Sequence, residues 1–282
     1  MINIFKEIRQ KIDEKKVRDE KKAQGRKLIA AAEKGNLKAV INILTITNND
    51  PEIVNYSPFV DKVTKAWCGE TILRGGTALE VAARNDHHSV VRALLNVPEI
   101  KLNEKSYHFH MRTPLQSAVT GGHVESAKLL AAKVGVDPNI KSYLDKTALM
   151  IALSSCKEAV PDLLRMPKLN INETTASGQT ALHFAVITTS KNPANKSYVE
   201  DVLAMPGVDV NVQDKDGNTP LILAIFKDKR DVVAALLKAG ADISKVNKLG
   251  LTAMQLAERS GNMEIQGLIV GVEKASAVQL RA

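Results

Sequence analysis

The sequence contains few aromatic residues: Phe, Trp and Tyr make up only 4% of its 282 residues, although hydrophobic residues together reach 44%. A core with so few large rings must be built from Ala, Leu, Val and Ile, which is typical of thin helices that pack closely. This composition disfavours a sandwich or barrel with large buried rings. An internal repeat is therefore the first pattern to search for, because repeat architectures are stacks of such helices.

Three further absences indicate the cellular compartment. The only cysteines, Cys68 and Cys156, lie far apart and form no CxxC pair, so they do not indicate the disulfide framework of a secreted fold. No apolar stretch approaches the roughly 20 residues that cross a bilayer. The first residues, 1–5, also lack the apolar core of a secretory signal. We therefore expect a soluble protein of the cytoplasm.

The strongest pattern in the sequence is an internal repeat. At six places a threonine is followed two residues later by Leu or Met and five residues later by Ala. Successive threonines are separated by 36, 34, 33, 39 and 33 residues, so the period is nearly constant. The six positions are Thr77, Thr113, Thr147, Thr180, Thr219 and Thr252.

Each repeat has the pattern of a helix pair. A threonine hydroxyl can cap the first helix, and Pro114 and Pro220 then fall in its first turn, where a missing N–H is harmless. Leu and Ala follow at helical spacing and form a narrow apolar stripe. A second helix carries pairs such as Val90-Val91 with Leu94-Leu95. The sequence thus predicts a stack of helix–turn–helix units.

This pattern resembles the ankyrin repeat, whose fingerprint is a T-P-L-H-x-A run at a period of 33 residues. The resemblance covers about residues 25–273, and Thr180–Ala185 carries the full TxLHxA form. It implies an all-α solenoid with short β-hairpin loops, and a hydrogen bond between Thr180 and His183 that caps the helix. Elsewhere the histidine slot is filled by Glu80, Gln116, Met150, Ile222 and Gln255.

The repeat pattern divides the chain into an ordered series. One further unit precedes Thr77 if Arg26 takes the threonine slot, which makes about seven repeats within residues 25–273. We expect an insertion at about 45–75, as a loop or an extra helix, and a frayed tail over 274–282. Asparagines recur 25 to 31 residues after four of the threonines, at positions 103, 139, 172 and 211. Pro161 predicts a shortened or late-starting second helix in its repeat.

Positive charge is concentrated at the N-terminus. Of the net charge of +8, residues 1–40 supply +6, with twelve Lys and Arg against six Asp and Glu. Acidic residues are interspersed among the basic ones, as in a solvated helix, and we expect residues 1–24 to form a basic capping helix. An alternative is membrane contact through the apolar residues of this segment, while nucleic acid is the less favoured partner. Those residues are Ile4, Phe5, Ile8 and Ile12.

Signs of catalysis are weak. Adjacent helical residues such as His87 and His88 point about 100° apart and do not converge on a metal, and His123 lies in ordinary turn sequence. There is no phosphate-binding glycine loop and no GxSxG elbow. The sharpest enzyme hypothesis is a cysteine nucleophile at Cys68, in the insertion; Cys156 fits a structural position between helices. We expect no enzyme, no metal and no cofactor.

The resemblance also indicates where a partner would bind. In ankyrin-like stacks, hairpin tips and the exposed side of the first helices form a concave surface. Rings and arginines gather in these slots, and such residues carry interface energy. We therefore predict a monomeric scaffold or adaptor, a host-directed bacterial effector being one possible setting, that binds an acidic, partly apolar protein. The predicted contact residues are Arg74, Arg84, Phe109, His110, Arg112, Tyr143, Leu144, Lys146, Phe226 and Lys227, of which Phe109, Arg112, Tyr143 and Lys146 would form one patch.

Overall fold

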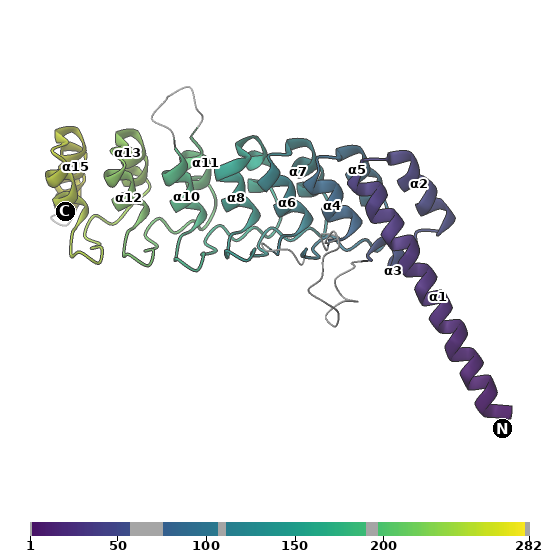
Figure 1. The fold of residues 1–282 in the computed structure, drawn as a ribbon. Helices are drawn as coiled ribbons and strands as arrows, with labels where there is room; N and C mark the ends of the chain where they lie inside the picture. The colour runs from purple at the N-terminus through teal and green to yellow at the C-terminus, as the bar shows by residue number, and fades with distance from the viewer. Residues whose placement is uncertain (1, 57–75, 107–110, 190–196, 280–282) are drawn as a thin grey trace, which may run out of the picture. The chain divides into compact units, whose positions relative to one another are not determined.

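The computed structural model describes residues 2–56, 76–106, 111–189 and 197–279 of the chain, with side chains from residue 10 to residue 274 within these ranges. The chain divides into two units, residues 1–143 and residues 144–282, which we describe separately. Regular structure in the described ranges is entirely helical (Figure 1), and this confirms the predicted all-α class.

The first unit consists of helix pairs in two layers. A layer of first helices, α1, α4 and α6, packs side by side, and a layer of second helices, α2, α5 and α7, covers it. The short helix α3 packs against α1. The bounds are α1 Ile2–Glu33, α2 Leu37–Ile46, α3 Pro51–Val54, α4 Ala78–Arg84, α5 His88–Leu95, α6 Pro114–Gly121 and α7 Val124–Ala131.

The second unit repeats the same arrangement. Its first helices are α8, α10, α12 and α14, and its second helices are α9, α11, α13 and α15. With the first unit, the described residues contain seven helix pairs, which is consistent with the predicted number of repeats. The bounds are α8 Ala148–Ser155, η1 Lys157–Ala159, α9 Val160–Leu164, α10 Ala181–Thr188, α11 Val199–Leu203, α12 Pro220–Phe226, α13 Arg230–Lys238, α14 Ala253–Ser260 and α15 Met263–Gln279.

The repeated threonines begin the first helices, as the sequence predicts. The Thr113 hydroxyl accepts a hydrogen bond from the Gln116 N–H at 3.3 Å, and the Thr219 hydroxyl accepts one from the Ile222 N–H at 3.2 Å. Pro161 lies in the first turn of α9, which begins late, after the 3₁₀ turn η1. The predicted late start of this helix is therefore confirmed.

The recurring asparagines join consecutive repeats. The Asn172 side chain donates to the Gly207 carbonyl at 2.7 Å and accepts from the Asp209 N–H at 2.9 Å. Asn103 bonds in the same way with the Gly135 carbonyl and the Asp137 N–H. A side chain that offers one donor and one acceptor can satisfy two backbone groups of the next loop, which explains the asparagine period.

A further asparagine of this kind, Asn55, escaped the sequence pattern. It donates to the Glu99 carbonyl at 3.0 Å and accepts from the Lys101 N–H at 2.6 Å. Its distance from Asn103 is larger than one repeat, because the part of the predicted insertion that follows residue 55 lies between them. Asn55 thus marks the first repeat, and the described part of the predicted insertion contains the extra helix α3.

The two predicted ends of the repeat domain need correction. The capping helix and the first helix of the first repeat form one continuous helix, α1, so Arg26 does not begin a helix. No proline or N-cap residue interrupts the chain there, and Gly25 is accommodated because the Tyr56 ring lies where a Cβ would otherwise stand. At the other end, α15 continues to Gln279 with no proline or glycine after Gly271, so residues 274–279 are helical and not a frayed tail.

Alanine substitutions at two glycines with positive φ distinguish the cost of backbone strain from the cost of a clash between repeats. Gly207→Ala adds a Cβ in open space at φ +75°, so we expect a loss of about 1 kcal/mol from the left-handed conformation alone. Gly217→Ala, at φ +73°, also places a Cβ 2.9 Å from the backbone nitrogen of Lys248. We expect Gly217→Ala to cost at least about 1 kcal/mol more in urea unfolding. Equal losses would contradict close contact between these loops.

Candidate functional site

Three of the ten predicted contact residues, Arg74, Phe109 and His110, lie outside the described residues. Within the first unit, the structure places Arg84 at the end of α4, Arg112 just before α6, and Tyr143 in a later turn. Within the second unit, Leu144 and Lys146 lie in the loop before α8. Phe226 and Lys227 lie at the C-terminal end of α12. Predicted residues are thus present on both units.

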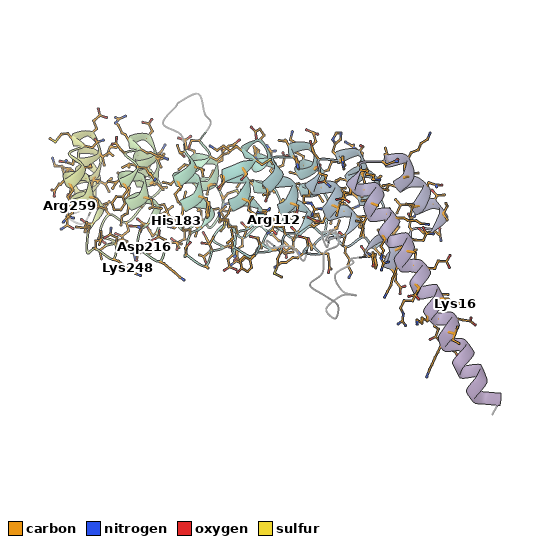
Figure 2. All side chains as sticks on the ribbon, viewed as in Figure 1. Lys16, Arg112, His183, Asp216, Lys248 and Arg259 are labelled. Carbon is orange, nitrogen blue, oxygen red and sulfur yellow. The ribbon has the colours of Figure 1, made fainter. Side chains whose placement is uncertain are left out.

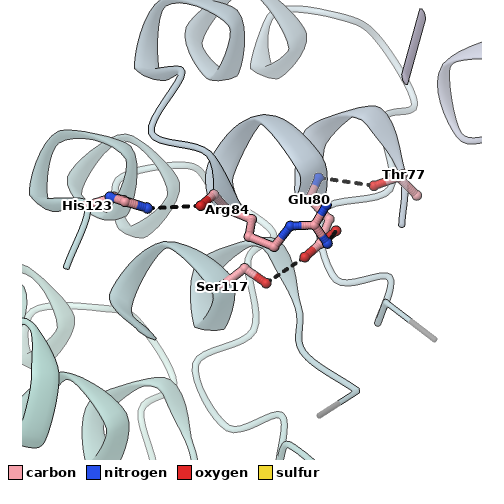
Figure 3. Close-up of polar contacts among 5 residues, drawn as sticks. All are labelled: Thr77, Glu80, Arg84, Ser117 and His123. Carbon is pink, nitrogen blue, oxygen red and sulfur yellow. Dashed lines mark hydrogen bonds and ion pairs between the residues drawn. The ribbon is translucent and has the colours of Figure 1, made fainter. Parts of the chain in front are cut away.

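A buried carboxylate, Glu80, contacts several residues around Arg84, one of the predicted contact residues of the first unit (Figure 3). Glu80 is 1% exposed, and its N–H donates to the Thr77 hydroxyl at 3.3 Å. The Ser117 hydroxyl donates to Glu80 Oε1 at 2.8 Å, from the first helix of the next repeat. On the other side, the Arg84 guanidinium lies 3.5 Å from Glu80 Oε2. The carboxylate therefore connects two repeats and fixes an arginine.

The charge of this site is only partly balanced. Burial raises the pKa of Glu80 above its ordinary value, while the Arg84 charge, the Ser117 hydrogen bond and the Arg112 charge act in the opposite direction. Among the described residues, Nε of Arg84 and Nε of Arg112 are buried and make no hydrogen bond. Glu80 thus has one arginine in ion-pair contact and the charge of a second arginine nearby, so positive charge outnumbers negative charge at this site.

Glu80 occupies the position that holds histidine in the full repeat motif. In two other repeats the residue at this position caps the first helix and contacts the next repeat. The Gln116 side chain completes a capping box and donates to the Ile140 carbonyl. His183 Nδ1 accepts from the Thr180 N–H at 3.1 Å, and His183 Nε2 lies 3.2 Å from the Asn218 carbonyl. The capping bond predicted for His183 is confirmed. Each residue joins its own helix cap to the following repeat.

Two other histidines, His87 and His123, also contact backbone. His87 Nε2 lies 2.9 Å from the Glu33 carbonyl, and His123 Nε2 lies 2.9 Å from the Arg84 carbonyl (Figure 3). Each ring thus reaches the end of the first helix in the preceding repeat. These positions are structural, as the sequence predicts for His87 and His123.

The comparisons with known proteins agree with this geometry. A family model for ankyrin repeats in three copies matches residues 28–142 and 188–277, more than half of the chain. The chain belongs to the ankyrin repeat family. A comparison with curated protein sequences found no match.

Solved ankyrin repeat structures share the fold. The ankyrin repeat domain of Bcl-3, a member of the IkappaB protein family, is 23% identical with a TM-score of 0.68, over 86% of this chain and 97% of that one. An ankyrin repeat domain from Acinetobacter baumannii AYE is 26% identical with a TM-score of 0.58, over 69% of this chain and 97% of that one. Ankyrin repeats are in general protein–protein interaction modules.

Several bulky side chains of this ankyrin repeat chain are exposed to solvent and do not pack in the core. Tyr143 is 67% exposed and Leu144 is 53% exposed, at consecutive positions of one turn. Phe226 is 51% exposed at the end of α12, and Lys227 beside it is exposed. Sequence reasoning missed Leu249, a leucine that is 74% exposed at a hairpin tip; its position directly before Gly250 was the signal available.

Lys146 differs from the other predicted contact residues. Its Nζ lies 4.9 Å from the centroid of the Phe184 ring, and Phe184 is buried. A cation over an aromatic face is attracted by the ring. The Lys146 charge therefore already has an intramolecular contact, and the sequence could not indicate this because the two residues lie in different repeats.

The alternative chemical functions concern metal ligands, cysteines and membrane-spanning helices in the described residues. No group of three or more His, Cys, Asp or Glu side chains there is arranged to hold a metal ion. Cys156 is buried, and Cys68 lies outside the described ranges. None of the helices in those ranges has the length and apolar character of a membrane span.

The buried Glu80 gives a pH-dependent prediction. Glu80→Gln keeps an acceptor for Ser117 but removes the ionisable group. Because the folded-state pKa of Glu80 is raised, the folded wild type loses stability relative to Glu80→Gln as pH rises from about the ordinary value of 4.5 through the raised pKa. Urea unfolding of both proteins at acidic and neutral pH measures this difference.

Glu80→Ala serves as the comparison, because it removes the acceptor, the ion pair and the side-chain volume together. We expect it to cost about 1–3 kcal/mol at either pH. A difference between wild type and Glu80→Gln that does not change with pH would contradict the buried ionisable carboxyl.

Proposed function

We propose that this chain is a non-catalytic scaffold or adaptor that binds a partner protein through its hairpin tips and first helices. The observation that carries the proposal is the exposure of large apolar side chains at these positions, next to cations that packing does not require. The partner presents an acidic, partly apolar surface or peptide, which complements both features.

The exposed rings support recognition for an energetic reason. A tyrosine or phenylalanine that is more than half exposed leaves apolar surface in water, and each square ångström that a partner covers contributes about 25 cal/mol. Tyr143 and Phe226 meet this condition, and both are residue types that often anchor interfaces. Leu144, the next residue in the chain, is also more than half exposed.

The charge distribution supports an acidic partner. The chain carries a net charge of +8, and the first unit places two half-buried arginines, Arg84 and Arg112, near a single carboxylate, Glu80. Lys227 adds an exposed cation next to Phe226. Complementary charge accelerates encounter and selects among partners more than it adds affinity. We further propose that the protein acts in the cytoplasm, as a monomer that recognises an acidic protein; action inside a host cell is the variant of this proposal for a bacterial effector.

A second candidate function rests on α1. Its N-terminal part extends beyond the other helices of the first unit (Figure 1), and residues 10–20 are all exposed, including Ile12 at 48% and Val17 at 54%. An exposed basic helix with apolar residues can recruit a protein to anionic lipid. The further alternative, a cysteine nucleophile at Cys68, concerns a residue outside the described ranges.

The turn at Tyr143 and Leu144 provides a test of partner binding. We expect Tyr143→Ala/Leu144→Ala to weaken partner binding by about 1–4 kcal/mol, because it removes two exposed apolar anchors. Thermal stability should change by roughly 0.5 kcal/mol or less, since neither side chain is in the core. The measurements are a thermal melt and binding to a partner first isolated with wild-type protein.

The matched control is Val134→Ala, which removes an apolar side chain that is 87% exposed in a turn of the second-helix layer. It should leave binding unchanged. A large melting loss in the double variant would show that Tyr143 and Leu144 are packing residues, and equal binding by all three proteins would contradict the proposed surface.

The basic helix can be tested separately. We expect simultaneous replacement of Lys11, Lys15 and Lys16 by glutamate to leave the melting temperature nearly unchanged, because all three side chains are exposed (Lys16 is labelled in Figure 2). If α1 serves as a cap alone, neither protein sediments with vesicles rich in phosphatidylserine. Sedimentation of the wild type that is lost on charge reversal would instead establish the membrane-recruited adaptor.

A further inference from the structure

A groove in the second unit has the composition of a binding pocket. It lies between the C-terminal ends of two neighbouring first helices, α12 and α14, and the loop that joins their repeats, and it has a volume of about 610 Å³. This is within the range of roughly 300–1,000 Å³ that ligand pockets occupy. The lining residues are Ile225, Phe226, Asp228, Leu249, Leu251, Leu256, Arg259, Ser260 and Asn262.

The apolar part of the groove has a buried floor and exposed edges. Ile225, Leu251 and Leu256 are between 2% and 8% exposed, whereas Phe226 is 51% exposed and Leu249 is 74% exposed. The floor belongs to the core of the repeats, so the fold accounts for it. The two edge side chains leave apolar surface in water on either side of the groove, and a ligand between them would cover both.

The hairpin tip that carries Leu249 is held in place. The Asn247 side chain is buried and accepts hydrogen bonds from the Leu249 N–H at 3.0 Å and the Leu251 N–H at 3.1 Å. Gly250, at φ +70°, provides the left-handed turn. An apolar residue on a fixed turn loses little conformational freedom on binding, so its contact contributes more to affinity.

The polar end of the groove contains one charged group without a partner. Asp228 accepts a hydrogen bond from the Asn262 amide at 2.6 Å, and the Ser260 hydroxyl donates to the Ala257 carbonyl at 2.9 Å. Arg259 is exposed and makes no hydrogen bond or ion pair within the described part of the chain. Its guanidinium presents five N–H donors in a planar fork that matches a carboxylate.

The surroundings of the groove increase its preference for negative charge. Lys227 follows Phe226, and Lys248 precedes Leu249 at the hairpin tip; both are exposed. Figure 2 labels Lys248 at this tip and Arg259 at the end of α14. The Asp228 carboxylate accepts from the neutral Asn262 amide and keeps its negative charge, so three cations, Arg259, Lys227 and Lys248, stand against this one lining anion.

From these observations we infer that the groove binds a partner segment in which a large apolar side chain stands next to an aspartate or glutamate. The apolar side chain lies between Phe226 and Leu249, on the floor formed by Leu251 and Leu256. The neighbouring carboxylate pairs with Arg259. This inference rests on the proposed protein-binding function and assigns it a specific pocket and ligand chemistry.

The test is a selection of random dodecapeptides, displayed on phage, for binding to the full-length protein. The enriched peptides should combine a large apolar residue with an adjacent Asp or Glu. Binding of the synthesised peptides should fall about tenfold or more in Arg259→Gln and in Leu249→Ala. The matched controls are Arg165→Gln and Val134→Ala, which change an exposed arginine and an exposed apolar residue away from the groove.

A charge reversal distinguishes recognition from a structural effect of Arg259. Selection on Arg259→Glu should enrich Lys or Arg in place of the acidic residue, because the carboxylate partner is then repelled. The inference is overturned if no peptide is enriched, or if enriched peptides bind wild type, Arg259→Gln and Leu249→Ala equally. If such peptides lose binding only in Tyr143→Ala/Leu144→Ala, the groove assignment fails while the proposed scaffold function stands.

Discussion

The dependence of each repeat on its neighbours is the constraint from which the rest of this structure follows. A helix pair in this chain is too thin to bury its own apolar face, so it buries that face against the next pair. The same constraint applies to polar groups. Asn103 and Asn172 satisfy backbone groups of the following loop, and His183 reaches the carbonyl of Asn218. Packing and hydrogen bonding thus act between the same neighbours.

This arrangement separates residues that build the stack from residues that remain available. The capping threonines, the slot residues Gln116 and His183, and the histidines at helix ends are all engaged in contacts between or within repeats. Glu80 differs from the other slot residues because it is an acid. It forms an ion pair with Arg84 and feels the charge of Arg112. The exposed apolar residues at turns and helix ends have no such role. Their exposure makes them the candidates for binding.

The sequence was sufficient to predict a structural role where that role depends on residues close together in the chain. The threonine caps, the late start of α9 at Pro161 and the Thr180–His183 capping bond each involve groups within a few positions of one another. It was misleading at the ends of the stack. There α1 continues through Gly25, and Tyr56, from outside the helix, occupies the space that a Cβ at this position would fill.

The sequence by itself determined the all-α class, the order of repeats and the residues that begin each first helix, because these depend on local spacing and on a period repeated many times. Only the tertiary structure decided which exposed side chains, predicted or not, are available to a partner. Lys146 lies over the ring of Phe184, while Leu249 and Arg259 stand beside Phe226 at one groove. Such distinctions arise from contacts between residues a repeat or more apart, and no local pattern encodes which side chains meet there.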